Sequence, residues 1–196
     1  MIIYEPTWKS YIVQSTDPVF SIDECNKIIK LGRSLPLHGG RIGVAPDEKG
    51  KSKTDHKIRQ NKISWIPFSK AVWMYSKLEH WMHTVNNKHM GFYQLQIGEM
   101  SQFTKYSKKE HYDWHPDSSY VMLKGPAVRK MSMIILLNDP KEFKGGELQI
   151  VDKKKLVALK QGHAVFFASF IAHRVVPVTK GNRFSLTIWF GGPPLI

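Results

Sequence analysis

Histidine and aspartate side chains gather in one short stretch of this chain, and both residue types bind divalent metals. Residues 111–117 contain two successive His-x-Asp pairs, His111 with Asp113 and His115 with Asp117, and a further histidine, His173, lies far downstream. A single pair is equally typical of an exposed polar loop. Two histidines and one carboxylate, however, are what an Fe(II) facial triad needs, since three protein ligands on one face leave three positions open. The residues indicate an iron site that combines His173 with one of the two pairs.

An arginine and a serine follow His173 at a spacing that suits the binding of an acid. A Gly181-Asn182 turn leads into a strand that carries Arg183 and Ser185, and alternate residues of a strand share one face. A guanidinium group pairs bidentately with a carboxylate. Arg183 is therefore suited to hold the far carboxylate of an oxo acid chelated to the metal, with the Ser185 hydroxyl beside it. A surface ion pair and an ordinary strand serine are the alternative interpretations.

Two helices are predicted before these residues. Ser21 and Glu24 have the spacing of a capping box, and apolar residues at helical spacing follow until Gly32 and Pro36, which are expected to close the helix. A second helix is predicted over residues 69–87, where a stripe of tryptophan and methionine should pack across a sheet. Residues 36–62 are rich in glycine, lysine and aspartate, which is typical of a long, mobile loop.

After residue 91 the pattern changes to short strand-like runs separated by turn residues. The predicted strands are residues 92–97, 102–106, 131–137, 147–150, 156–159, 164–168, 174–178 and 184–190. Strands this short favour a sandwich or jelly roll. The predicted fold class is α+β, mainly β: a double-stranded β-helix with supporting N-terminal helices. We expect one domain over residues 1–196, with a helical part over 1–90 and a jelly-roll catalytic core over 91–193.

The chain is strongly basic, with 29 Lys and Arg residues, 16 Asp and Glu residues and a net charge of +13. Such a field attracts polyanions, but the lysines are scattered over several predicted loops, which favours a solvated surface over a nucleic-acid partner. The one cysteine, Cys25, fits a reducing compartment and excludes a cysteine-rich zinc site. No apolar run approaches the roughly 20 residues that cross a bilayer, and the first residues do not look like a secretion signal. We expect a soluble, cytoplasmic protein without a membrane partner.

A series of motifs in the second half of the chain resembles the 2-oxoglutarate/Fe(II) oxygenase superfamily. It is most similar to the prolyl-4-hydroxylase-like branch and to the PKHD-type hydroxylases of bacteria and phages. The motifs are YDWHPD at 112–117, RKMSM at 129–133 leading into LLN at 136–138, FKGGEL at 143–148, GHAVFF at 162–167, HRVVPV at 173–178, and GNRFSL at 181–186 followed by Trp189. They stand in the order of the family and cover nearly half of the chain.

The resemblance implies a role for each candidate residue. It selects His115 over His111, because the family has an aromatic residue three positions before its first iron ligand, and Tyr112 stands there. His115, Asp117 and His173 then match the iron ligands, and Arg183 matches the residue that binds the C5 carboxylate of 2-oxoglutarate. Tyr106 and Tyr112 match tyrosines near the co-substrate, and simple core packing is the alternative for both.

Two positions depart from the family pattern. Lys109 stands where relatives commonly have glycine, so the local turn is expected to differ. The usual proline is missing at residues 168–170. Neither departure is expected to touch a proposed ligand.

The activity implied by the resemblance is hydroxylation of an unactivated C–H bond with Fe(II), 2-oxoglutarate and O2. The products are succinate and CO2, and ascorbate (vitamin C) is a supporting reductant. A protein or peptide side chain is the expected substrate. The apolar residues Met133, Ile135 and Phe167 are expected to form a dry wall beside the metal.

Two other functions are weighed against this one. The basic charge suits a nucleic-acid dealkylase, but such enzymes carry a second arginine at the position of Trp189. A catalytically silent jelly-roll binding module is the other alternative, and a silent relative is free to lose the ligand residues that this chain keeps. The oligomeric state has no indication in the sequence.

Overall fold

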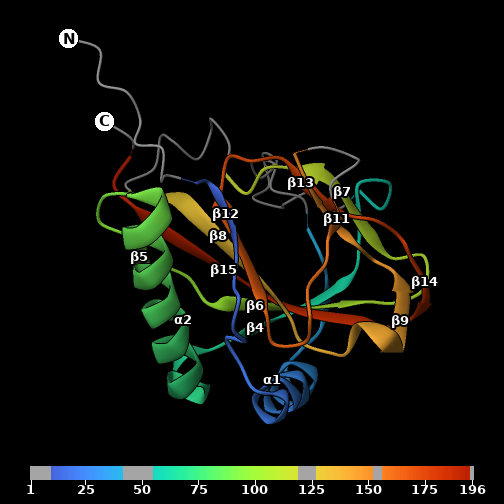
Figure 1. The fold of residues 1–196 in the computed structure, drawn as a ribbon. Coiled ribbons are helices and arrows are strands. Elements are labelled where there is room, and N and C mark those ends of the chain that lie inside the picture. Colours follow the sequence, from blue (N-terminus) through green and yellow to red (C-terminus); the bar gives the residue numbers. More distant parts are fainter. Residues whose placement is uncertain (1–9, 42–54, 119–126, 152–155, 195–196) are drawn as a thin grey trace, which may run out of the picture.

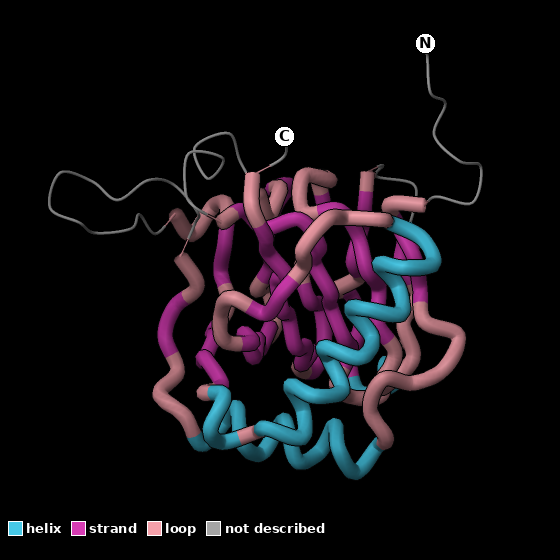
Figure 2. The backbone as a smooth tube through the Cα atoms, turned by 90° about the vertical axis from the view of Figure 1, so that its left-hand side faces the viewer, coloured by secondary structure: helices cyan, strands magenta, loops and turns pink. Residues whose placement is uncertain are grey.

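Two helices flank a β structure in a computed structural model that describes residues 10–41, 55–118, 127–151 and 156–194. Helix α1 spans Ile22–Ser34 and helix α2 spans Val72–Val85. Figure 1 shows α2 running beside the larger sheet and α1 lying below it, and Figure 2 shows both helices from a view turned by 90°. Shorter helical turns are Phe68–Lys70 (η1), Asn86–Met90 (η2, a π-helix) and Pro140–Glu142 (η4).

The first helix begins as its sequence predicts and ends at Ser34, between the predicted closing residues Gly32 and Pro36. Ser21 Oγ accepts a hydrogen bond from Glu24 N at 3.2 Å, and the Glu24 carboxylate accepts one from Ser21 N at 2.9 Å. This confirms the capping box. Gly32 lies within the last turn, where a Cβ atom would collide with the ring of Phe103 on the sheet.

The larger sheet is antiparallel and eight-stranded. In spatial order its strands are β1 (Ile12–Gln14), β12 (Ala164–Ala168), β8 (Val128–Leu136), β15 (Arg183–Gly192), β6 (Ser101–Tyr106), β4 (Lys62–Ile66) and β2 (His38–Gly39), with β5 (Gln96–Ile97) also paired to β15. The two longest strands, β8 and β15, pair in the middle of the sheet. Arg183 and Ser185 lie at the start of β15.

A smaller antiparallel sheet carries the proposed metal ligands. In spatial order its strands are β11 (Leu156–Val157), β10 (Leu148–Ile150), β13 (His173–Val175), β7 (His111–His115) and β3 (Arg59–Gln60). Two further strands, β9 (Phe143–Gly145) and β14 (Val178–Gly181), form a separate pair.

Two hydrophobic clusters occupy the spaces between these layers. The larger one lies between the helices and the larger sheet, and it includes Met133 and Ile135. The smaller one includes Ile134 and Phe167 from the larger sheet and Val175 from the smaller sheet. The prediction that Met133 and Ile135 face the site is therefore wrong. Successive side chains of a strand point to opposite faces, so Ile134 takes that place.

Other sequence predictions hold only in part. The segment 36–62 is not one continuous loop, because β2, β3 and the start of β4 lie in it; its residues 42–54 are outside the described part of the chain. The predicted strand 92–97 is reduced to β5. Strands β1, β7 and β9 were not predicted, and β7 is a polar strand without apolar alternation.

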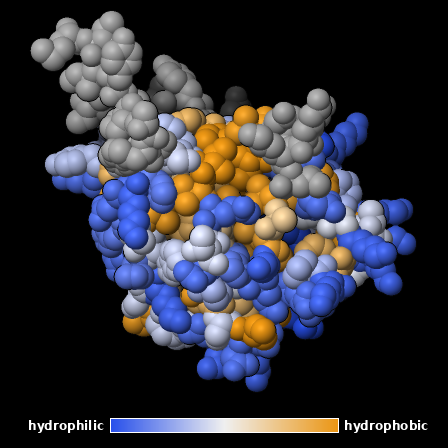
Figure 3. Space-filling view, in the orientation of Figure 1, coloured by the Kyte–Doolittle hydropathy of each residue, from blue (hydrophilic) through white to orange (hydrophobic). Residues whose placement is uncertain are grey.

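The surface in the view of Figure 3 is hydrophilic around its edges and has a hydrophobic area in its upper part. Among the helices that the structure describes, none has the length and apolar character to span a membrane.

The turn that links the two sheets between β6 and β7 contains a strained residue. Lys109 has a φ of +72°, and its N–H donates to Val178 O at 2.7 Å. Residues 107–110 form the turn, with Glu110 N donating to Ser107 O at 2.9 Å. A positive φ at the third position of such a turn favours glycine or asparagine. The chain therefore keeps a glycine-type turn although it lacks the glycine.

Replacing Lys109 by glycine is expected to stabilise the protein slightly. Left-handed backbone costs a non-glycine residue roughly 1–2 kcal/mol, and the extra freedom of glycine in the unfolded chain returns about 0.5–1 kcal/mol of that. The free energy of unfolding in urea should rise by up to about 1 kcal/mol. Lys108→Gly is the matched control, because Lys108 has no positive φ, and it should lower stability. A Lys109→Gly protein less stable than wild type would contradict this account of the turn.

Candidate metal centre and active-site cavity

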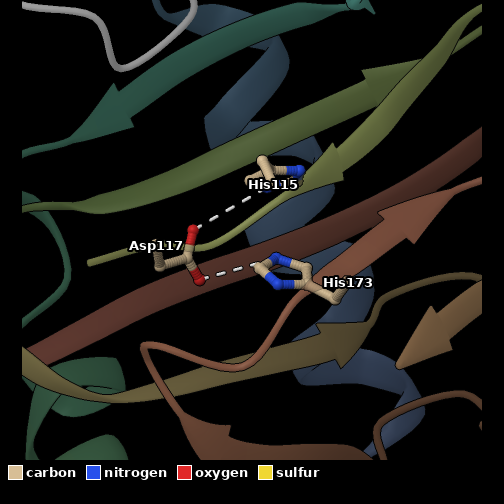
Figure 4. A group of neighbouring side chains, drawn as sticks. All are labelled: His115, Asp117 and His173. Atoms are coloured by element: carbon tan, nitrogen blue, oxygen red, sulfur yellow. Dashed lines mark ion pairs between the residues drawn. The ribbon is translucent and has the colours of Figure 1, made fainter. Parts of the chain in front are cut away.

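The two histidines of the proposed triad lie side by side on paired strands. His115 ends β7 and His173 begins β13, and the antiparallel register places them directly opposite each other. Their ring centroids are 4.2 Å apart. Figure 4 shows both rings beside the Asp117 carboxylate. Residues far apart in sequence therefore meet because two short strands pair.

Each imidazole is held in one orientation by a backbone carbonyl. His115 Nδ1 lies 2.7 Å from Asp113 O, and His173 Nδ1 lies 3.1 Å from Ile171 O. Since a carbonyl only accepts, Nδ1 carries the proton in both rings and Nε2 keeps its lone pair. The Nε2 atoms of His115 and His173 are 3.9 Å and 3.6 Å from the Asp117 carboxylate. Both rings thus present an unprotonated nitrogen to the same point.

Asp117 is positioned by its backbone and by two serines. Asp117 N donates to Ser169 O at 2.9 Å, and Asp117 Oδ2 accepts from Ser132 Oγ at 2.7 Å. Ser132 Oγ is in turn 2.9 Å from Ser169 Oγ. We expected that the missing proline at residues 168–170 would not affect a proposed ligand. This expectation is wrong, because the Ser169 carbonyl accepts a hydrogen bond from the backbone of Asp117.

Electrostatics favours the ligand forms of these groups. Burial, and after it the neighbouring His173, lower the pKa of His115 to about 3, so this imidazole is neutral near pH 7. Burial by itself raises the pKa of Asp117, but His173, His115 and Ser132 Oγ bring it below its ordinary value, so Asp117 is ionised. The donor set is thus two imidazoles and one carboxylate, with ligand atoms within 4.8 Å of one another.

A bulge in β7 explains why Tyr112, the aromatic residue three positions before His115, lies beside the His115 ring. His173 pairs with His115 while Val175 pairs with Tyr112, so β7 contains one residue more than its partner over this span. A bulge of this kind changes which side chains share a face. Tyr112 and His115, three residues apart, stack with ring centroids 3.4 Å apart and planes at 13°. Burial raises the pKa of Tyr112 to about 12, so its hydroxyl stays protonated.

The other His-x-Asp pair lies outside this cluster. The two ring nitrogens of His111 are near backbone carbonyls, Lys57 O at 3.0 Å and Lys109 O at 3.3 Å. The Asp113 side chain is 51% exposed and lies 3.6 Å from Arg174. Geometry therefore separates the two pairs that the residue types alone left equivalent.

A cavity of about 710 Å³ opens beside the triad. Its lining includes all three triad residues together with Tyr106 and Tyr112. Sequence reasoning missed several other lining residues: Arg59, Trp65, Gln102, Arg129 and Trp189. Arg59 comes from the segment predicted as a mobile loop, and no local pattern there indicated a strand.

Arg183 and Ser185 lie at the far side of Tyr106 and do not line this cavity. Arg183 pairs with Tyr106 across β15 and β6, and its guanidinium carbon is 5.5 Å from the Tyr106 ring centroid. Arg183 is only 3% exposed, and burial lowers its pKa. Its Nη1 donates to Ser185 Oγ at 3.0 Å, and it forms no ion pair with a carboxylate in the part of the chain that the structure describes. It also borders a second cavity of about 400 Å³.

The sequence comparison finds a match for this region. Residues 101–191 match the sequence model of the 2OG-Fe(II) oxygenase superfamily, and the matched segment includes the triad and Arg183. Over this segment the chain is similar to that superfamily. The PKHD-type hydroxylase of Shewanella frigidimarina is 32% identical over 92 residues, which are 44% of this chain and 41% of that protein. The chain thus spans about two fifths of the length of the curated relatives it matches.

Solved structures extend the similarity to nearly the whole chain. The viral collagen prolyl hydroxylase of Paramecium bursaria Chlorella virus-1 has a TM-score of 0.70 at 18% identity and covers 93% of this chain and 97% of its own. A prolyl hydroxylase of Trichoplax adhaerens, in complex with a peptide fragment of hypoxia inducible factor, also has a TM-score of 0.70 at 18% identity, covering 92% of this chain and 83% of its own. The predicted jelly-roll fold is confirmed.

Proposed function

We propose that this protein is an Fe(II)- and 2-oxoglutarate-dependent dioxygenase that hydroxylates an unactivated C–H bond in a protein or peptide side chain. The observation that carries the proposal is the convergence of His115, Asp117 and His173, whose ligand atoms lie within 4.8 Å of one another beside a large cavity. Three ligands on one side of an ion suit an iron that must also bind a co-substrate and O2.

The residues present fit the metal and the co-substrate. Two imidazoles and the ionised carboxylate form a donor set for a divalent cation, and the carbonyl contacts of both Nδ1 atoms leave the Nε2 atoms facing the carboxylate. Arg183 is a buried cation that forms no ion pair with a carboxylate among the described residues, where only the charge of Glu147 acts on it from a longer distance, and a buried charge of that kind favours an anionic ligand. A dicarboxylate chelated at the triad would supply that anion.

Each residue then has a defined task. When bound, Fe(II) supplies the activation of O2, and 2-oxoglutarate is converted to succinate and CO2. His115, Asp117 and His173 hold the metal, and Arg183 binds the C5 carboxylate while Ser185 orients the guanidinium. Tyr106 lies between Arg183 and the main cavity. The apolar side chains of Ile134 and Phe167, in the cluster between the sheets, exclude water from the co-substrate.

The substrate and the setting are parts of the same proposal. A Trichoplax adhaerens prolyl hydroxylase with the same fold was solved with a peptide fragment, which supports a peptide substrate here. Ascorbate is proposed as the reductant that restores Fe(II), and the cytoplasm as the location. Residues 91–193 are proposed as the catalytic core, with residues 1–90 supporting it.

Anaerobic spectroscopy tests the proposal. Addition of Fe(II) and then 2-oxoglutarate to the wild-type protein should produce a visible charge-transfer band, and admission of air should yield succinate even without substrate. Succinate formation separates an enzyme from a catalytically silent binding module. Absence of both the band and succinate would overturn the proposed function.

A further inference from the structure

A second buried arginine faces the active-site cavity from a different element. Arg59 lies on β3, where it pairs with Tyr112 of β7, and it is 8% exposed. Its guanidinium donates to three neutral oxygens: Asn61 Oδ1 at 3.2 Å, Arg41 O at 2.8 Å and Gln102 Oε1 at 3.2 Å. Arg59 also lines the cavity that contains the triad. These contacts fix the position of the guanidinium, but the three neutral acceptors do not neutralise its positive charge.

The charge of Arg59 has no counterion in the described part of the chain. Arg129, another arginine of the cavity, differs, because both ends of its guanidinium donate to Glu99 at 2.6 Å. A buried charge is costly without a partner of opposite sign. Asp117 is the one acidic side chain among the described lining residues, and the proposed metal takes its charge. Among the described lining residues, Arg59 therefore leaves a positive charge that no neighbouring carboxylate neutralises.

Arg59 lies close to the reacting centre. Its guanidinium carbon is 4.3 Å from the Tyr112 ring centroid. The His115 ring already covers one face of Tyr112 at 3.4 Å, so the guanidinium must cover the other face. The stack Arg59–Tyr112–His115 thus places a fixed positive charge one ring away from a metal ligand. An anionic group bound by Arg59 would lie near the position of the C–H bond to be hydroxylated.

The aromatic residues of the cavity argue against a nucleobase as that ligand. Base recognition in an active-site pocket uses stacking on an open aromatic face. Both faces of Tyr112 are covered, and Trp189 lies between Arg129, at 3.9 Å, and Trp65, whose ring centroid is 6.1 Å away at a 45° tilt. The observations favour a carboxylate-bearing peptide.

We propose that Arg59 forms a subsite for the side-chain carboxylate of an Asp or Glu that neighbours the hydroxylated residue in an acidic peptide substrate. This inference rests on the proposed function, since it concerns the substrate of the same site. Each of the two buried arginines then binds one anionic group: Arg183 binds the co-substrate and Arg59 binds the substrate.

Pairs of short synthetic peptides test the subsite. The two members of each pair have one central proline and differ at one neighbouring position, which is Asp in one member and Asn in the other. Binding is measured by fluorescence anisotropy on the full chain with Fe(II) and 2-oxoglutarate, without O2. At one position at least, the Asp peptide should bind the wild type at least about tenfold more tightly, as expected for one charge-assisted contact.

Variants identify the residue responsible. Arg59→Gln should remove the preference for Asp while the affinity for 2-oxoglutarate stays unchanged, and Arg59→Lys, which keeps the charge, should retain part of the preference. Arg33→Gln is the matched control, because Arg33 is an exposed arginine of α1 and its removal changes the net charge equally. Arg33→Gln should keep the full preference.

Three results would overturn the subsite: equal binding of Asp and Asn peptides to the wild type, an Asp preference that survives in Arg59→Gln, or tighter binding of a single-stranded oligodeoxynucleotide than of every acidic peptide. The charge-transfer band separates this failure from failure of the proposed function. A band without an Asp preference overturns the subsite alone, whereas an Asp preference without a band or succinate overturns the proposed activity and keeps the anion site.

Discussion

His173→Ala is expected to abolish Fe(II)-dependent turnover of 2-oxoglutarate. The variant keeps His115 and Asp117 but removes the ligand from β13, and two ligands from one short segment do not hold the ion in place. Loss of a residue that merely supports a ligand typically costs 10–100-fold in metal affinity, so loss of the ligand itself should exceed about 100-fold. Fe(II) affinity by anaerobic titration, the charge-transfer band and succinate formation are the measurements.

Two controls make the result on His173 specific. His80→Ala removes an exposed histidine of α2 and should leave iron binding unchanged. Ser132→Ala removes the 2.7 Å hydrogen bond to Asp117 and should give an intermediate loss, about 10–100-fold. A full charge-transfer band in His173→Ala would exclude His173 as a ligand. Melting of the metal-free variants shows whether each one is folded.

Arg183→Met is expected to weaken the binding of 2-oxoglutarate and to stabilise the metal-free protein at the same time. The buried guanidinium donates to Ser185 and forms no ion pair among the described residues, where only the charge of Glu147 acts on it from a longer distance, so its burial is costly until an anion binds. A methionine of similar length removes that cost, and the free energy of unfolding should rise by on the order of 1 kcal/mol. The KM for 2-oxoglutarate should rise about 100-fold, which is the loss of a bidentate charged contact.

The comparison with neighbouring variants tests this assignment. Ser185→Ala should raise the KM for 2-oxoglutarate less, because the serine acts through Arg183. Arg59→Gln should leave it unchanged. Fe(II) binding in the absence of 2-oxoglutarate should be the same in Arg183→Met as in wild type. An unchanged KM in Arg183→Met would show that another cation, such as Arg59 in the main cavity, binds the co-substrate.

Local patterns in the sequence predicted the elements that depend on local interactions. The capping box at Ser21, the two helices and the strands β6, β8, β12 and β15 follow from residue spacing, and the structure contains them within a few residues. The polar strand β7 was missed because its stability comes from pairing with β13 and β3, and no periodicity of its own residues indicates that pairing.

The sequence also left open which face of each strand points toward the helices. The alternation in β8 indicates two faces, but which face meets the helices depends on packing against segments elsewhere in the chain. Met133 and Ile135 therefore belong to the helix-side core and Ile134 to the cavity. A shift of one residue exchanges the two faces of a strand, so the sequence pattern alone leaves both assignments equivalent.

By itself, the sequence determined the inventory of the site: two histidines, a carboxylate, a downstream arginine, and the order in which they occur. Those are properties of covalent order and residue chemistry. Tertiary structure decided which His-x-Asp pair meets His173, because antiparallel pairing and a bulge in β7 turn His115 and Asp117 inward and leave Asp113 exposed. Tertiary structure also placed Arg59 on the face of the Tyr112 ring opposite His115, since contacts between distant segments depend on the burial and pairing of the whole chain.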